Sequence, residues 1–556
     1  MIMKAKLRVG ILLNNYFIHA WEYKIVEEII NSDFAEIKLL IKNESGNTQL
    51  LKIKKKLGFR VLRLHERIDK ILFKNKSDYY ERKNISDLLK NVPEIIIKPV
   101  EEGTRNIFKA DDLTVIKRHK LDIIINFGFA LLNGEILKIP KYGIWSYLQG
   151  DNRIINAVST GYWEIVDKNP ITSSVLEILE EDPGKGTNIF CSHESTYVYS
   201  VNVNRNKLFW RASLFIPRIM NGIYLYGDSY LKMLIHKFNK DERVNAIGTF
   251  SAPAFIPALR NLIIYFGVTI RQICKKVLYS DSFNWMLLFE INNVENVLSN
   301  SFGRFKKLQS SKDKFWADPF ILARNGKFYI FVEEFIYRTN KGHISVIELD
   351  GSGNLLGSEI IINRPYHLSY PFIFEINATY YMIPETSQNK TIELYKCREF
   401  PDKWEFFGNL MENICAVDTT LLFHNRKWWI FTSIDDTDNI SGGSTELFLY
   451  FSDDLFSDDW KSHPNNPLVS DIRTARPAGR IFIRDNKIYR PSQDCSVRYG
   501  KGFNLNEITV LTETEYEEEL LIKVEPSWDN KLKGTHTFNF DKNFTIIDAY
   551  SYRRRI

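Results

Sequence analysis

The sequence has little of what marks a secreted, membrane-spanning or disulfide-stapled protein. It contains five cysteines in 556 residues, an odd number without the close spacing of a disulfide framework or a structural zinc site. No apolar run reaches the ~18 residues of a membrane-spanning helix. The short run that begins at Val9 breaks at Asn14, too early for a signal peptide. We therefore expect a cytoplasmic protein with no membrane span.

Signals for a nucleic-acid, dinucleotide or metal partner are also missing. The 74 basic and 68 acidic residues are spread along the chain, and we interpret the basic end at residues 553–555 as a solvated tail. Gly10 stands alone after the first predicted strand, so that strand is not followed by a glycine-rich phosphate loop. Histidines and carboxylates do not recur at metal-ligand spacing. We expect no metal, no cofactor and no nucleic-acid partner.

The N-terminal part alternates strands and helices. Apolar strands are predicted at residues 7–13, 35–41 and 121–127, and a helix at 20–30. A continuous apolar run such as 121–127 is typical of a parallel sheet covered on both faces. The pattern predicts a doubly wound α/β domain over residues 1–215.

A helical segment is predicted to follow, over residues 216–280. Apolar residues recur at helical spacing over residues 261–279, with basic residues on the other side. This helix either packs two domains together, the interpretation we favour, or lies on a membrane surface.

The most informative pattern is a phrase that recurs four times within residues 281–556. Each copy contains two short apolar strands broken by a turn, and its first and last anchors lie 15 residues apart. The first anchors, which we call column one, are Asp318, Tyr370, Asp418 and Ala478. The last anchors, column two, are Glu333, Glu385, Ser433 and Gln493. Units that begin about 50 residues apart and cannot bury their own faces predict a β-propeller. A weaker fifth copy from Gly534 to Ile547 suggests five blades.

Column one points to a site, because a purely structural repeat would hold one residue type. Carboxylates beside apolar residues on an inner strand are costly when buried without a partner. Asp318 and Asp418 are therefore expected to line a wet axial cavity, with Arg476, Arg490 and His536 as partners. The alternative is that both carboxylates cap blade turns by accepting hydrogen bonds from backbone N–H groups.

Residues 119–200 resemble the formyltransferase fold of methionyl-tRNA and sugar-nucleotide formyltransferases. The matching segments are residues 119–128, 137–143, 161–165 and 171–175. In that family an Asn, a His two residues later and an Asp on a later loop carry out the transfer. Here those positions hold Ser146, Leu148 and Gly184. The resemblance thus implies a domain that keeps the fold and has lost the reaction.

An active sugar N-formyltransferase remains the alternative. It would need Gln149, Asp151 or Asp182 as substitutes, and formyl-tetrahydrofolate as its cofactor. The propeller would then serve as its substrate-binding module.

The predicted propeller is similar to the N-terminal domain of plant glucosamine inositolphosphorylceramide transferase and its bacterial relatives. The phrases that carry this resemblance lie at residues 316–320, 366–372, 383–386, 416–420, 475–480, 490–494 and 534–537. The wider architecture looks like the five-bladed propellers of arabinanases and levansucrases, which place carboxylates at the axial ends of inner strands. The resemblance implies catalytic roles for Asp318, Asp418 and Glu385. The implied substrate-binding residues are Trp316, Glu333, Tyr370, Arg476, Arg490, Gln493, Asp494 and His536.

We therefore predict a carbohydrate-active or carbohydrate-binding protein of bacterial surface-glycan or glycolipid biosynthesis. The expected ligand is a carbohydrate or a sugar nucleotide, and glycan-assembly enzymes are candidate partners. A transferase or glycosidase-like activity is favoured, and a non-enzymatic scaffold is the third alternative. The sequence leaves the sugar, the linkage and the oligomeric state open.

Overall fold

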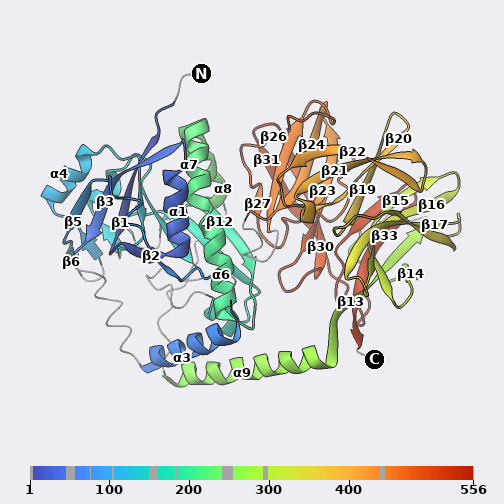
Figure 1. The fold of residues 1–556 in the computed structure, drawn as a ribbon, viewed down its shortest axis with the longest axis horizontal. Coiled ribbons are helices and arrows are strands. Elements are labelled where there is room, and N and C mark those ends of the chain that lie inside the picture. Colours follow the sequence, from blue (N-terminus) through green and yellow to red (C-terminus); the bar gives the residue numbers. More distant parts are fainter. Residues whose placement is uncertain are drawn as a thin grey trace. The chain divides into compact units, whose positions relative to one another are not determined.

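The computed structural model describes residues 4–44, 57–74, 77–102, 105–129, 131–149, 161–182, 185–240, 255–291, 298–436 and 445–554. These residues form two compact units (Figure 1). The first extends to Arg271, and the second begins at Gln272, within helix α9 (Phe255–Leu278).

The first unit is built on a seven-stranded mixed sheet in the order β12-β11-β10-β8-β1-β3-β5. Five neighbouring strands are parallel: β10 (Ile144–Gln149), β8 (Ile123–Asn126), β1 (Leu7–Leu13), β3 (Ala35–Asn43) and β5 (Glu94–Ile97). The other two, β11 (Ile171–Ile178) and β12 (Thr187–Ser195), are antiparallel. The parallel sheet predicted for this part is confirmed, and the antiparallel edge was not foreseen.

Helices cover both faces of this sheet, so alternate residues of a strand lie in different hydrophobic cores. Ile11 of β1 belongs to one hydrophobic core and Leu12 to another. The helices are α1 (Ala20–Ile30), α3 (Leu57–Leu72), α4 (Ala110–Arg118), α5 (Trp163–Val166), α6 (Val201–Ala212), α7 (Phe215–Tyr226), α8 (Asp228–Asn239) and the 3-10 turn η1 (Glu135–Lys138). Short strands complete the unit: β2 (Phe17–His19), β4 (Arg82–Asn84), β6 (Val100–Glu102), β7 (Arg105–Ile107) and β9 (Leu131–Asn133).

Helices α7, α8 and α9 fall within the segment predicted to be helical. Helix α7 packs on α1 and β3, and α8 packs on β12, so both belong to the first unit. Among the described residues, no helix has the length and apolar character that a membrane crossing requires.

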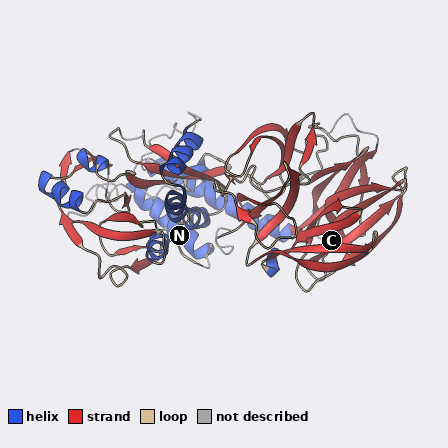
Figure 2. Ribbon diagram, turned by 90° about the horizontal axis from the view of Figure 1, so that it is seen from above, coloured by secondary structure: helices blue, strands red, loops and turns tan. Residues whose placement is uncertain are grey.

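The second unit is a five-bladed β-propeller, made almost entirely of strands (Figure 2). Blade 1 contains β15 (Lys314–Arg324), β16 (Lys327–Ile336), β17 (Lys341–Leu349) and β18 (Leu355–Ile362). Blade 2 contains β19 (Ser369–Ile376), β20 (Thr379–Glu385), β21 (Thr391–Glu399) and β22 (Lys403–Glu412), with the 3-10 turn η3 (Ser387–Asn389). Blade 3 contains β23 (Ala416–His424), β24 (Lys427–Ile434), β25 (Glu446–Ser452), β26 (Lys461–Ser462) and β27 (Val469–Ser470). Blade 4 contains β28 (Phe482–Arg484), β29 (Lys487–Asp494), β30 (Gly502–Leu511) and β31 (Tyr516–Val524).

Blade 5 closes the ring with strands from both ends of the propeller. Its order is β14 (Lys306–Leu308), β13 (Tyr279–Ile291), β33 (Phe544–Arg554) and β32 (Phe538–Asp541). The strand β13 precedes blade 1 in the sequence and pairs along most of its length with β33. The predicted five-bladed propeller is therefore confirmed, and its fifth blade is a composite of two distant segments.

The first strands of the repeats meet one another. Strand β15 contacts β19 and β32, and β19 contacts β23. Residues at the start of these strands therefore come together from different blades, which places column one near the propeller axis.

Candidate functional site

The repeats bring a group of polar side chains from all five blades into one buried network. We call this group the axial cluster, and its members are Asp318, Glu333, Tyr370, Glu385, Asp418, Arg476, Gln493, His536 and Asp548. The charges of Asp418 and Asp548 both act on Asp318, and those of Asp318 and Glu385 act on Glu333. The two predicted columns therefore converge.

A bulge repeated in three blades aims column one at this cluster. Asp318, Tyr370 and Asp418 have φ of 51°, 44° and 52°, in the left-handed region that residues other than glycine rarely occupy. Each lies where strand pairing slips, between Ala317 and Phe320 in blade 1 and at the equivalent places in blades 2 and 3. Bulges of this kind redirect a side chain out of the normal alternation of a strand.

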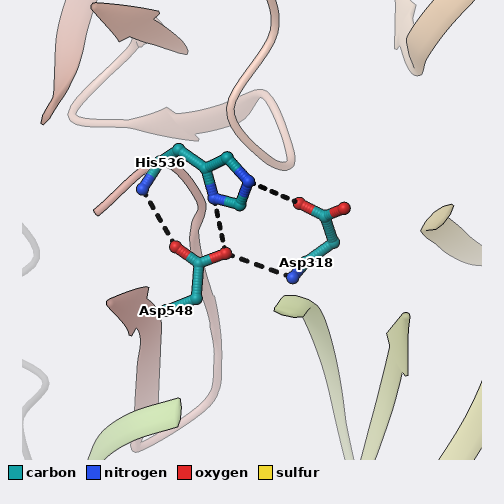
Figure 3. A group of neighbouring side chains, drawn as sticks. All are labelled: Asp318, His536 and Asp548. Carbon is teal, nitrogen blue, oxygen red and sulfur yellow. Dashed lines mark hydrogen bonds and ion pairs between the residues drawn. The ribbon is translucent and has the colours of Figure 1, made fainter. Parts of the chain in front are cut away.

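Three residues of blades 1 and 5 are connected by hydrogen bonds and an ion pair (Figure 3). His536 Nδ1 lies 2.6 Å from Asp548 Oδ2, and His536 Nε2 lies 3.6 Å from Asp318 Oδ1. The imidazole stacks on Trp285, with ring centroids 4.1 Å apart. Thr537 Oγ1 donates to Asp318 Oδ1 at 2.8 Å. The ring of His536 is therefore held in place from two edges and one face.

Asp548 also holds the backbone of this region. Its two oxygens accept hydrogen bonds from the backbone N–H groups of Asp318 at 3.1 Å, His536 at 2.9 Å and Thr537 at 3.1 Å. Its side chain is fully buried. Asp548 thus fixes both the bulge at Asp318 and the position of the imidazole.

Asp418 is bound by side chains of blade 4. Arg476 Nε donates to Asp418 Oδ2, and Gln493 Nε2 donates to the same oxygen at 2.8 Å. Arg476 also lies 3.8 Å from Glu385 Oε2. The guanidinium of Arg476 thus interacts with carboxylates of blades 2 and 3.

Glu385 keeps one oxygen available for a ligand. Ser387 Oγ donates to Oε1 at 2.9 Å. The other oxygen, Oε2, is buried and accepts no hydrogen bond from the described residues. A carboxylate oxygen in that position is able to accept a hydrogen bond from a ligand hydroxyl.

Glu333 faces a neutral histidine. The backbone N–H of Gly342 donates to His367 Nδ1 at 2.9 Å, so the proton of the neutral ring is on Nε2, which lies 3.3 Å from Glu333 Oε1. Burial lowers the pKa of His367. The Nε2–H group of the neutral His367 ring therefore faces Glu333.

The axial cluster contains more carboxyl groups than basic side chains. Burial raises the pKa of Asp318 and of Asp418 to about 6, even though His536 and Arg476 respectively oppose the shift. Burial, followed by the charge of Asp318, raises the pKa of Glu333 well above its usual range. Burial opposes protonation of His536, but Asp548 and Asp318 outweigh it and raise the pKa of the imidazole. Burial and the neighbouring negative charges thus favour the protonated form of Glu333.

The predicted wet cavity and the predicted turn-capping role both differ from this arrangement. Asp318 and Asp418 are 4% and 1% exposed. Their carboxylates bond to side chains from other blades, and the role of accepting backbone N–H groups belongs to Asp548. Asp318, His536 and Asp548 offer atoms within 4.8 Å of one another, close enough for a cation. However, Asp548 already uses both oxygens on the three N–H groups and the ring.

The structure does not bring all the predicted binding residues to this cluster. The indole of Trp316 is buried and donates to Glu334 at 2.7 Å. Arg490 binds Glu518 through two bonds of 2.7 Å, within blade 4. Asp494 is the last residue of β29, and Lys501 donates to it at 3.1 Å.

Tyr370 reaches the cluster but is fully buried. Its hydroxyl bonds Thr420 Oγ1 at 2.9 Å and accepts from the backbone N–H of Gly479 at 2.7 Å. It therefore supports the cluster and offers no face for stacking on a sugar ring.

Sequence reasoning missed three residues of the site. Asp548 directly follows Ile547, where the predicted fifth copy ended, so one more residue of the repeat would have included it. His367 lies outside both columns of the repeat, so the spacing of the repeat does not mark it. Tyr499 is 38% exposed, lies 5.1 Å from the Arg476 guanidinium and meets the ring of His536 edge-on. It is the aromatic face that is open beside the cluster, and no repeat marks it.

The formyltransferase-like positions lie in the first unit. Ser146 and Leu148 are in β10, and Leu148 is buried in an apolar cluster with Val175 and Cys191. Asp182 is exposed and pairs with Lys185 at 2.8 Å. Gln149 ends β10. Asp151 and Gly184 lie outside the described residues.

The comparisons with known proteins agree with the predicted resemblance of the propeller. Residues 304–550 match the family described as "Glucosamine inositolphosphorylceramide transferase 1, N-terminal". The rice (Oryza sativa subsp. japonica) protein named glucosamine inositolphosphorylceramide transferase 1 is 32% identical over 240 residues, 42% of this chain and 31% of that protein. The chain thus spans about a third of the length of this relative.

Two solved structures are similar to parts of the chain at low identity. An exo-1,5-alpha-L-arabinanase from a bovine ruminal metagenomic library is 16% identical, with a TM-score of 0.31, over 44% of this chain and 95% of that one. Glycinamide ribonucleotide transformylase 1 from Symbiobacterium toebii is 10% identical, with a TM-score of 0.25, over 40% of this chain and 88% of that one.

Proposed function

We propose that the propeller binds a carbohydrate at the axial cluster and acts on it, in a protein of glycan or glycolipid assembly. The main support for this proposal is that carboxyl groups from separate blades come together and that burial raises their pKa values to different extents. Groups whose environments drive their pKa values apart are the usual components of acid–base sites. The relative named for a glycosyl-lipid transferase supports the same class of substrate.

The cluster contains the parts that chemistry at a sugar carbon needs. Glu333 holds a proton near neutral pH and would deliver it to the departing oxygen. Asp318 or Asp418, once ionised, would stabilise the positive charge that develops on the sugar carbon. Arg476 and Tyr499 would hold the sugar, the first by hydrogen bonds and the second by its ring face. Glu385 would accept a hydrogen bond from a sugar hydroxyl at Oε2, which accepts none from the described residues.

The decisive experiment separates binding from turnover. Purified protein is titrated calorimetrically with a panel of monosaccharides and sugar nucleotides, and product is followed by mass spectrometry. We expect Glu333→Gln to bind its ligand within a few-fold of wild type and to lose at least about 100-fold in turnover, the usual contribution of a general acid. Asp418→Asn should lose both, because Arg476 would lose the charge of the carboxylate that it binds.

Glu359→Gln is the matched control, because it makes the same chemical change at an exposed position of the outer strand β18. It should leave binding and turnover unchanged. If Glu333→Gln matches this control in both quantities, the cluster is not the site. If wild type binds a sugar without converting it, the propeller is a binding module, and if it binds none, the scaffold alternative holds.

We further propose that the first unit has a formyltransferase-like fold that has lost formyl transfer. Leu148, at the position of the family's histidine, is a buried alkyl side chain that cannot accept or donate a proton. Incubation with formyl-tetrahydrofolate and amino-sugar nucleotides should therefore give no formylated product. Formylated product that disappears in an Asp182→Asn variant would instead support the active alternative.

A further inference from the structure

Helix α9 has two faces of different character. Its inner face packs within the first unit, where Ala258, Leu262 and Tyr265 are buried. The Tyr265 hydroxyl lies 2.7 Å from Asp69 Oδ1 of α3 and 2.7 Å from the backbone carbonyl of Tyr199, and its single proton is donated to one of these two acceptors. The inner face therefore fixes the orientation of the helix, and with it the orientation of the outer face.

The outer face exposes large aliphatic side chains in a continuous stripe. Leu259 lies three residues after Ile256, and Ile263 four residues after Leu259. Ile264 is next to Ile263, and Ile270 lies two turns beyond Ile263. All five side chains are between 41% and 77% exposed. The inner face packs within the first unit, and the packing of two domains together by this helix stays a prediction. An apolar stripe of this length left open on a helix marks an interaction surface rather than ordinary surface scatter.

The charge of the helix selects the kind of partner. Its 24 residues include four basic residues and no acidic one. Arg260 and Arg271 are exposed beside the aliphatic stripe. The neighbouring helix α3, which contacts α9 through Asp69 and His65, adds exposed Arg60 and Arg67. Aliphatic and basic side chains thus share the outer face of α9.

We propose that the outer face of α9 docks on an anionic lipid membrane surface. Basic amphipathic helices lie in the headgroup region with their aliphatic side chains inserted and their basic side chains on the lipid phosphates. A second copy of this chain fits less well, because two such faces would oppose basic residues without any acid on either helix. The docking is peripheral and involves no step of the chemistry at the axial cluster.

The test uses the full chain and vesicles. Wild type should sediment with phosphatidylcholine vesicles that contain about one-third phosphatidylserine, and much less with pure phosphatidylcholine. Because anionic attraction is screened by salt, the bound fraction should fall as ionic strength rises. The double variant Ile263→Glu, Ile264→Glu should lose at least about tenfold in affinity, or about 1.4 kcal/mol. Val115→Glu, exposed on α4 of the same unit, is the matched control and should bind as wild type does.

A probe on the helix itself provides a second measurement. Cys274 is an exposed free thiol in α9, one turn beyond Ile270, and an environment-sensitive fluorophore attached there should shift to the blue on anionic vesicles. Circular dichroism verifies that each variant is folded. If the protein does not bind vesicles, if the double variant binds as tightly as wild type, or if light scattering shows only self-association through this face, the proposal is refuted.

Discussion

The substitution Asp318→Asn tests the electrostatics of the axial cluster most directly. Burial raises the pKa of Asp318 from 3.8 to about 6. A carboxyl whose pKa is higher in the folded than in the unfolded state stabilises the fold below pH 3.8, and that contribution is lost as pH rises through about 6. The full loss corresponds to about 3 kcal/mol by about pH 8.

Asparagine at this position mimics the protonated carboxyl. It tolerates the left-handed φ of 51° better than most residues, and its amide oxygen can accept the hydrogen bond from Thr537. The variant should therefore be about 1.5 kcal/mol more stable than wild type at about pH 5 and about 3 kcal/mol more stable at about pH 8. For a unit of this size that is a rise of about 6 to 12 °C in the melting temperature of the propeller.

The assay is differential scanning calorimetry of both proteins at the two pH values. Comparing the variant with wild type at each pH removes the contribution of titrating groups that do not interact with Asp318. Asp548→Asn is the matched contrast, because its carboxylate accepts three backbone N–H groups and the imidazole. It should be destabilised at both pH values. The reasoning fails if Asp318→Asn is less stable than wild type at about pH 8. The ion pair between ionised Asp318 and His536 would then stabilise the fold by more than burial of the charge destabilises it.

Three further substitutions test the packing that supports the site, each by thermal unfolding. Tyr370→Phe should cost about 1–3 kcal/mol, because the buried backbone N–H of Gly479 would lose its acceptor; an unchanged melting temperature would contradict this. Glu518→Ala should cost about 3–5 kcal/mol by leaving the buried guanidinium of Arg490 unpaired, and a loss below about 1 kcal/mol would show that Arg490 has other support. Gly479→Ala should prevent stable folding of blade 4, because a Cβ there would lie 2.0 Å from the carbonyl oxygen of Phe538 and φ is 137°; soluble protein with wild-type stability would refute the geometry.

The axial positions could be predicted because the repeat is local. Each hairpin is encoded by a few neighbouring residues, so the spacing between Asp318 and Glu333 recurs between Tyr370 and Glu385 without any knowledge of the fold. The repeat alone could not decide whether the two aspartates line a hydrated cavity or accept hydrogen bonds from backbone N–H groups at blade turns. The answer depends on Arg476 and Thr537, which come from blades 4 and 5 and meet the aspartates only when the ring closes.

The predicted binding residues that lie elsewhere show what strand geometry adds. Arg490 and Gln493 are three residues apart on β29, so their side chains point to opposite faces of the strand, and only Gln493 reaches Asp418. This could have been seen in the sequence. Trp316 and Asp318 are two apart and would share a face in a regular strand, but the bulge at Asp318 breaks that relation. The bulge has no distinct residue type to mark it.

The sequence by itself determined the hairpins, their number and the columns of polar residues, because strand alternation and turn chemistry act over a few neighbouring residues. The tertiary structure decided how the fifth blade is completed, which partners the buried acids have and which acid retains its proton. Those outcomes depend on contacts between segments more than 200 residues apart, such as Asp318 with Asp548, and on the loss of water around charges that only ring closure brings together.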